Sequence, residues 1–212
     1  MFNARSKILK KDDAMNELDE EVAKLLYDYE MQLKEDSVIK KDISRIFISS
    51  VEEFKTTEVN GQHTRCILIR IPYKSLMHFR SIRNNVISHL ERKMSCSVFV
   101  VAIRKILSKR VSTPGVKKRP ISRTLTHVYN CLLEDVTLPS SIVGKQIRVN
   151  LDGTQSTKIY LDPLDKDKVE DRLDAMSEAY RRVTSKKVKF MFAKPTKFQK
   201  ALAEFKKKQK QQ

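Results

Sequence analysis

The chain has 212 residues, of which 43 are Lys or Arg and 26 are Asp or Glu, so its formal net charge is +17. Only four glycines occur, and they form neither a G-x-G-x-x-G nor a G-x-x-x-x-G-K-[ST] pattern, which excludes the common phosphate-binding loops. Cys66, Cys96 and Cys131 lie far apart, so we expect a reduced intracellular protein without disulfides or a zinc ribbon. No apolar run is long enough for a membrane span or a secretion signal.

Two segments hold the whole excess of positive charge. Residues 104–123 contain eight Lys and Arg and no acid, and residues 181–212 contain twelve Lys and Arg with Glu204 as the one acid. The rest of the chain therefore has a net charge of only −2. Charge concentrated in this way indicates a polyanionic partner, whereas evenly spread charge would only aid solubility.

The first half of the chain predicts a helix, a hairpin, a helix and a strand. Asp12 or Asp13 is a plausible N-cap for an amphipathic helix, whose apolar side chains recur at helical spacing up to Leu33. Asn60-Gly61 then predicts a hairpin between a strand containing Ile46 and Ile48 and a strand at 66–71. A helix from Ser75 to Met94 and a buried strand at 98–103 complete a ββαβ unit.

The second half repeats this order after the basic loop. Ser122 is the expected N-cap of a helix that ends before Pro139. A hairpin follows, with strands at 146–151 and 156–161 around Asp152-Gly153. A helix bearing Val169, Leu173, Met176 and Tyr180 then leads to a strand at 188–192.

We therefore predict an α+β (mixed α/β) fold of two hairpin–helix–strand units, with an N-terminal amphipathic helix, a long basic loop and a basic C-terminal tail. The two units could share one sheet or form two lobes. We expect residues 1–192 to form one compact body, or alternatively lobes of about 1–106 and 122–192 joined by the basic loop 107–121. Residues 193–212 form a basic C-terminal extension, which we expect to become ordered on a partner.

No pattern in the sequence predicts an active site. The four histidines occur singly, without metal-binding spacing, and of these His127 could contact a phosphate or stack on a base. The acid pairs Glu52-Glu53 and Glu134-Asp135 would have to cluster to form a two-metal nuclease, but neighbouring residues diverge on a helix or a strand. We therefore expect no catalytic residue, metal site, cofactor or small-molecule substrate.

The basic loop is the main candidate for a binding site. Its cations would repel one another unless phosphates screened them, and its arginines can bridge phosphates bidentately. The loop has no aromatic side chain for base stacking and no bulky apolar face for membrane insertion, so we expect RNA recognition through backbone and shape, and no membrane partner. The candidate RNA-binding residues, including two on the strand that follows, are Arg104, Lys105, Lys109, Arg110, Lys117, Lys118, Arg119, Arg123, Lys145 and Arg148.

Three motifs around this loop resemble a known family. They are Arg119–Thr126, Leu133-Glu134-Asp135 and the stretch from Pro139 to Gly153. In this order they are similar to the eukaryote-specific ribosomal protein seven of the small subunit, and Leu90–Ser95 resembles a helix end of the same family. Residues 193–212 extend beyond the point where that family tends to end.

The resemblance implies a non-catalytic structural constituent of the cytosolic small ribosomal subunit. Its partners would be small-subunit rRNA and neighbouring ribosomal proteins. It would take part in pre-rRNA maturation and small-subunit assembly, with passage through the nucleolus. The alternative is a regulatory or interaction protein that binds nucleic acid outside the ribosome, with its basic segments serving as import signals or binding patches.

Overall fold

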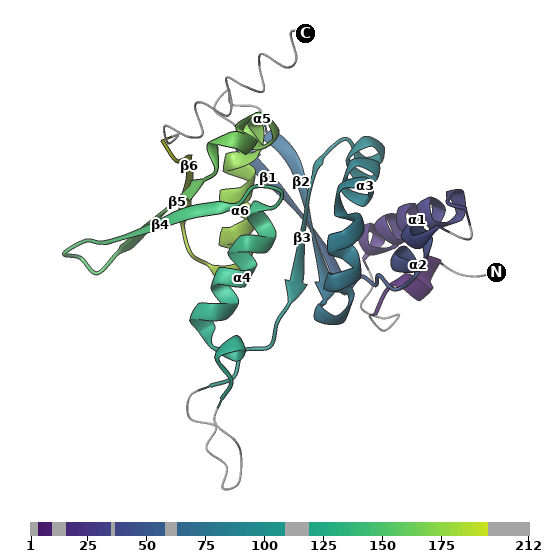
Figure 1. Ribbon diagram of the computed structural model, residues 1–212, viewed down its shortest axis with the longest axis horizontal. Coiled ribbons are helices and arrows are strands. Elements are labelled where there is room, and N and C mark those ends of the chain that lie inside the picture. Colours follow the sequence, from purple (N-terminus) through teal and green to yellow (C-terminus); the bar gives the residue numbers. More distant parts are fainter. Residues whose placement is uncertain (1–3, 10–15, 35–36, 58–62, 109–118, 195–212) are drawn as a thin grey trace, which may run out of the picture. The chain divides into compact units, whose positions relative to one another are not determined.

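The computed structural model describes residues 4–9, 16–34, 37–57, 63–108 and 119–194 (Figure 1). The chain divides into two compact units, Met1–Val136 and Thr137–Gln212. Each unit has its own three-stranded sheet, so the two predicted ββαβ patterns do not share one sheet. The predicted α+β class is confirmed.

The first unit is built on the sheet β1-β2-β3. Strand β1 (Ser50–Thr57) pairs antiparallel with β2 (His63–Pro72), and β2 pairs parallel with β3 (Ser97–Ile103) through the crossover helix α3 (Leu76–Met94). The other elements are the short 3-10 helices η1 (Ala4–Lys7), η3 (Tyr73–Ser75) and η4 (Ile121–Arg123), and the helices α1 (Glu17–Gln32), α2 (Val38–Ser44) and α4 (Leu125–Thr137). The predicted hairpin is confirmed, although Asn60-Gly61 lies outside the described residues.

The core of the first unit lies between the central strand and the helices. Ile67, Ile69 and Ile71 alternate along β2 and pack in one apolar cluster with side chains of α1 and α3, such as Leu26 and Leu90. Residues 66 and 68, on the opposite face of β2, are also buried. Burial on both faces explains why this strand has an unbroken apolar sequence.

Helix α1 begins later than the sequence predicted. Asp12 and Asp13 lie outside the described residues, and the N-cap is Asn16, whose capping box includes Asp19. Asp19 is fully buried and also accepts a hydrogen bond from the backbone N–H of Val51, at 2.6 Å. The cap therefore joins α1 to β1, a long-range role that helical periodicity does not reveal.

Two other predicted details are wrong, and one short helix was not predicted. The first strand begins at Ser50, because Ile48 instead forms an isolated parallel bridge with Ile8. Ser122 lies inside η4 and does not cap α4, which begins at Leu125. The helix α2, capped by the Ser37 side chain, was not predicted because seven residues carry too little periodicity.

The second unit repeats the topology of the first. Strand β4 (Ile142–Val149) pairs antiparallel with β5 (Gln155–Leu161), which pairs parallel with β6 (Val188–Phe192). The crossover consists of η5 (Pro163–Asp165), α5 (Lys166–Val169), η6 (Glu170–Arg172) and α6 (Leu173–Thr184), so the single predicted helix is interrupted. Its core includes Ile159, Leu161, Met176 and Phe190, all buried. Of the C-terminal extension, only Ala193 and Lys194 are described.

Candidate nucleic-acid interface

The basic loop leaves β3 and returns to α4 through a hydrogen-bonded stem. The backbone N–H of Leu107 donates to the carbonyl of Arg123 at 3.1 Å. The guanidinium of Arg119 donates to the carbonyl of Leu107 at 2.8 Å. These contacts hold the outgoing segment at Leu107 beside the returning segment at 119–123.

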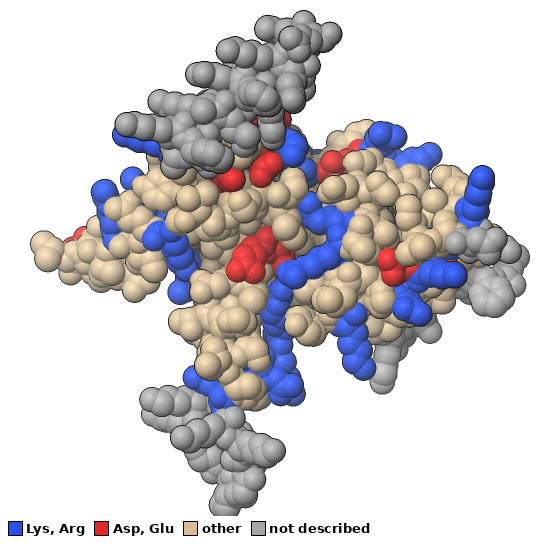
Figure 2. Space-filling view, in the orientation of Figure 1, with Lys and Arg blue, Asp and Glu red and all other residues tan. Residues whose placement is uncertain are grey.

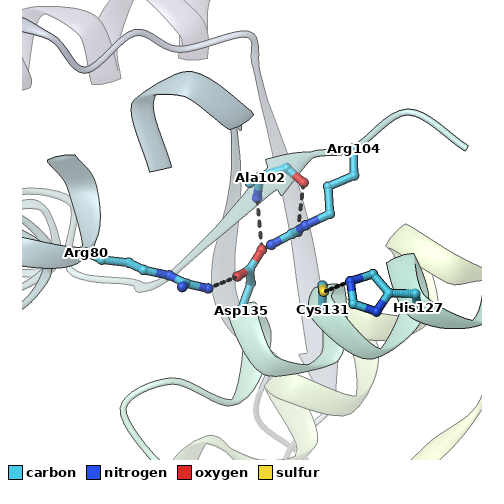
Figure 3. A network of polar contacts seen from close by, with 6 residues as sticks. All are labelled: Arg80, Ala102, Arg104, His127, Cys131 and Asp135. Atoms are coloured by element: carbon cyan, nitrogen blue, oxygen red, sulfur yellow. Dashed lines mark hydrogen bonds and ion pairs between the residues drawn. The ribbon is translucent and has the colours of Figure 1, made fainter. Parts of the chain in front are cut away.

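A buried carboxylate anchors the base of this stem (Figure 3). The Asp135 side chain on α4 is 1% exposed and accepts hydrogen bonds from the backbone N–H of Ala102 at 3.3 Å and from Arg104 at 2.5 Å. Arg80 of α3 lies 3.5 Å from its other oxygen. Asp135 therefore connects α4 to the end of β3 and to α3.

The guanidinium of Arg104 is committed to this network. Its side chain is 9% exposed, it donates to the carbonyl of Ala102, and it lies 5.9 Å from the ring centroid of Tyr73. Burial is the largest single effect and disfavours its charged form, but the hydrogen bond to Asp135 and the negative charge of that carboxylate together raise the pKa of Arg104. The sequence predicts Arg104 as one of the RNA-binding cations, whereas in the structure its guanidinium forms a buried ion pair with Asp135.

Of the other loop candidates, three are exposed in the structure and four lie outside the described residues. Lys105, Arg119 and Arg123 are exposed on the stem. Figure 2 shows Lys and Arg side chains gathered at the bottom of the view, where β3 leads into the stem and α4 begins. Four further candidates, Lys109, Arg110, Lys117 and Lys118, lie outside the described residues.

The two candidates of the second unit do not lie on one surface. Lys145 and Arg148 are three residues apart on β4 in continuous register with β5, so their side chains point to opposite faces. They therefore do not form one continuous cationic surface along the strand. Partial burial and the nearby positive charge of Lys186 lower the pKa of Lys145, so Lys186, which the sequence did not single out, is its cationic neighbour.

Nothing in the described residues assembles a catalytic constellation. Of the pair Glu134-Asp135, the first is exposed and the second is buried against Arg104, so the two carboxylates do not converge. No group of three or more His, Cys, Asp or Glu side chains within the described ranges could hold a metal ion. None of the helices in that part of the chain is both long and apolar enough to cross a membrane.

Comparison with known proteins identifies the family. The model of the family described as ribosomal protein S7e matches residues 6–192. The chain belongs to the ribosomal protein S7e family. It is 37% identical over 194 residues to small ribosomal subunit protein eS7 of Avicennia marina, covering 91% of this chain and 98% of that protein. The corresponding protein of Arabidopsis thaliana is 34% identical, covering 91% of this chain and 97% of its own length.

S7e membership confirms the resemblance that the motifs around the loop suggested. The match includes both ββαβ patterns and the whole basic loop, and it ends at Phe192, the last residue of β6. The S7e family is a class of ribosomal proteins and not of enzymes. Residues 193–212 lie beyond the match.

Proposed function

We propose that this protein is a structural, non-catalytic constituent of the small subunit of the cytosolic ribosome. Its S7e match over residues 6–192 carries this proposal. We further propose that it binds small-subunit rRNA, contacts neighbouring ribosomal proteins, and takes part in small-subunit assembly and pre-rRNA maturation during passage through the nucleolus. Relatives named as small ribosomal subunit protein eS7 support the placement in the subunit.

The charge distribution supports rRNA as the partner of the basic loop. Its eight cations occur without an acid, and Arg104 alone among them has its charge compensated in the described structure by a buried carboxylate, that of Asp135. The stem contacts hold Arg119 and Arg123 in place, and Lys105 is exposed on the same stem. A phosphate backbone compensates such a concentration of charge and releases its counterions on binding.

Arg104 has a different role in this proposal from the other loop cations. Because its guanidinium is held by Asp135, it positions the start of the loop and does not contact RNA. The phosphate contacts then fall to the other loop residues and, on β4, to Arg148, because Lys145 lies on the other face of that strand.

The salt dependence of RNA binding tests the loop. Lys105→Ala, Lys117→Ala and Lys118→Ala together remove three loop cations and leave Arg119 to hold the stem. Each phosphate contact contributes about 0.7 to 0.9 to the slope of log affinity against log salt, so we expect the slope for a small-subunit rRNA transcript to fall by up to about 2 to 3.

A matched control removes the same charge elsewhere. Lys24→Ala, Arg92→Ala and Lys93→Ala change three exposed cations on α1 and α3, and should leave the slope near that of the unmodified protein. Equal slopes for the loop variant and the control variant would contradict the proposed role of the loop.

Sedimentation tests the placement in the ribosome. The full-length chain should remain with small subunits through high-salt washing, in a stoichiometric amount. A protein that is released by the wash would instead fit the alternative of a nucleic-acid-binding regulator outside the ribosome.

A further inference from the structure

The β4–β5 hairpin extends beyond its own sheet. Pairing of β5 with β6 begins at Thr157, whereas pairing of β5 with β4 continues outward to Gln155 opposite Val149. Figure 1 shows this hairpin projecting past β6 in the second unit. The tip is a turn in which Gly153 has a positive φ of 74°, a backbone conformation suited to glycine.

On one face of the projecting part, the β4 side chains are apolar and exposed, and they lie opposite Thr157 and Gln155 of β5. Lys145, Ile147 and Val149 share a face of β4 by alternation, and Lys145 is opposite Ile159, which is fully buried. The face therefore continues the core face of the sheet outward. Ile147 is 54% exposed, Val149 is 63% exposed, and Leu151 in the turn is fully exposed. We call these three side chains the apolar hairpin face.

The corresponding hairpin of the first unit shows that an exposed apolar face is not required by the topology. There, Lys55 of β1 lies opposite Arg65 of β2, towards the outer end of the pairing. Both positions are exposed and charged, as expected for a strand end in water. Exposed aliphatic side chains at the tip of the second hairpin therefore indicate a contact surface.

Charge and chemistry favour a protein over RNA as the occupant of this face. The hairpin cations Arg148 and Lys158 lie on the opposite face, and the three aliphatic side chains have cations only at their base, where Lys186 lies near Lys145. A phosphate backbone needs cations, and base stacking needs aromatic rings, which Ile, Val and Leu do not supply. The complementary surface is an apolar protein patch with a carboxylate at the rim that faces Lys145.

The small size of the face limits what kind of protein it binds. Three aliphatic side chains cover far less than the roughly 800 Å² that each partner contributes to a stable interface. Such a contact is effective when other contacts already hold both proteins in one assembly, because the local concentration of the partner is then high. The partner is accordingly a fixed neighbour and not a free protein.

We propose that the apolar hairpin face docks onto an apolar, carboxylate-rimmed patch of a neighbouring protein in the small ribosomal subunit. This inference rests on the proposed function, since it requires the chain to be part of that subunit. It assigns a partner class to a surface that lies apart from the basic loop in the sequence.

Site-specific photo-crosslinking from the two faces of the hairpin tests the proposal. A photoreactive residue replaces Val149 on the apolar hairpin face, or Ser156, which is exposed on the opposite face, as the matched control, in the full-length chain. Small subunits containing each variant are purified through high-salt sedimentation and irradiated. We expect one crosslinked protein from position 149 that is absent from position 156. A crosslink from 149 to rRNA or to a second copy, or no crosslink from subunits that contain the variant, would overturn the proposal.

A second variant separates docking from folding. Ile147→Thr with Val149→Thr keeps the β-branched shape and removes apolar surface, and we expect an unchanged melting temperature of the free protein together with loss of the protein crosslink from a probe at Leu151. Ser156→Ala, on the opposite face of the hairpin, should retain that crosslink. Persistence of the crosslink in the double variant contradicts the proposal. Absence of the chain from washed subunits instead refutes the proposed function, and the docking proposal with it.

Discussion

Replacing Asp135 by Asn removes the charge at the base of the loop with almost no change in volume. The amide oxygen can still accept from the N–H of Ala102, but Arg104 loses its buried ionic partner. Breaking one side of a buried ion pair costs about 3 to 5 kcal/mol. Because one hydrogen bond and the contact of Arg104 with Tyr73 remain, we expect a loss near 3 kcal/mol, at the lower end of that range.

Urea unfolding of the full-length chain measures this loss, and hydrogen exchange of the β3 backbone locates it in the first unit. Arg104→Met combined with Asp135→Asn removes both charges, so the double variant should be more stable than the two single losses predict when added, by about 1 to 3 kcal/mol. Glu53→Gln breaks the exposed pair with Arg65 and should cost less than about 1 kcal/mol. If Asp135→Asn costs no more than this control, the network does not anchor the stem.

Three further predictions concern α1, α3 and the thiols. Burial, and then the charges of Lys93 and Arg92, lower the pKa of His89, whose ring lies 4.5 Å from Tyr29. The stability that neutral His89 contributes is therefore complete above the ordinary pKa of 6.5 and falls as the pH drops below it. In His89→Phe, the urea concentration at the unfolding midpoint should change less between pH 8 and pH 5 than in the unmodified protein. An unchanged pH dependence would contradict this. Asp19→Ala should lower the free energy of unfolding in urea by about 2 to 3 kcal/mol, because it leaves the buried N–H of Val51 without that acceptor. Glu17→Ala, in the same helical turn, should be nearly neutral. Similar losses in the two variants would contradict a stabilising contact between α1 and β1. Burial raises the pKa of the Cys96 thiol to about 11, so iodoacetamide at pH 8 should label the partly exposed Cys131 first, as read by mass spectrometry; earlier labelling of Cys96 would be inconsistent with its burial.

Long periodic elements were predictable from the sequence. Short elements, and features that depend on contacts between distant residues, were not. The spacing of apolar residues predicts α3, and the β-branched run at 98–103 predicts β3, because each pattern repeats over enough residues to have one interpretation. The N-cap of α1 was misplaced because Asn16 is selected by a contact between Asp19 and Val51, which are far apart in the sequence. The same limit applies to Ile48, whose partner Ile8 belongs to another element.

For the candidate interface, the sequence identified the region but not the role of each residue. Counting charges located the loop, and every described loop cation except Arg104 is exposed. Arg104 differs because Asp135 of helix α4, which is distant in the sequence, lies within hydrogen-bonding distance of it. Lys145 and Arg148 were grouped by proximity in the sequence, whereas strand alternation separates them onto two faces.

By itself, the sequence determined the α+β class, the two ββαβ patterns, the concentration of charge and the S7e family. These properties depend on local composition, on periodicity and on the order of motifs, all of which can be read from the sequence without knowing which distant residues meet. Only the tertiary structure decided that the two patterns form separate sheets, that Asp135 withdraws Arg104 from the loop's exposed cations, and that the second hairpin extends past β6 with an uncovered apolar face. Each of these depends on which distant residues meet, because burial and ion pairing are set by neighbours in space and not by neighbours in the chain.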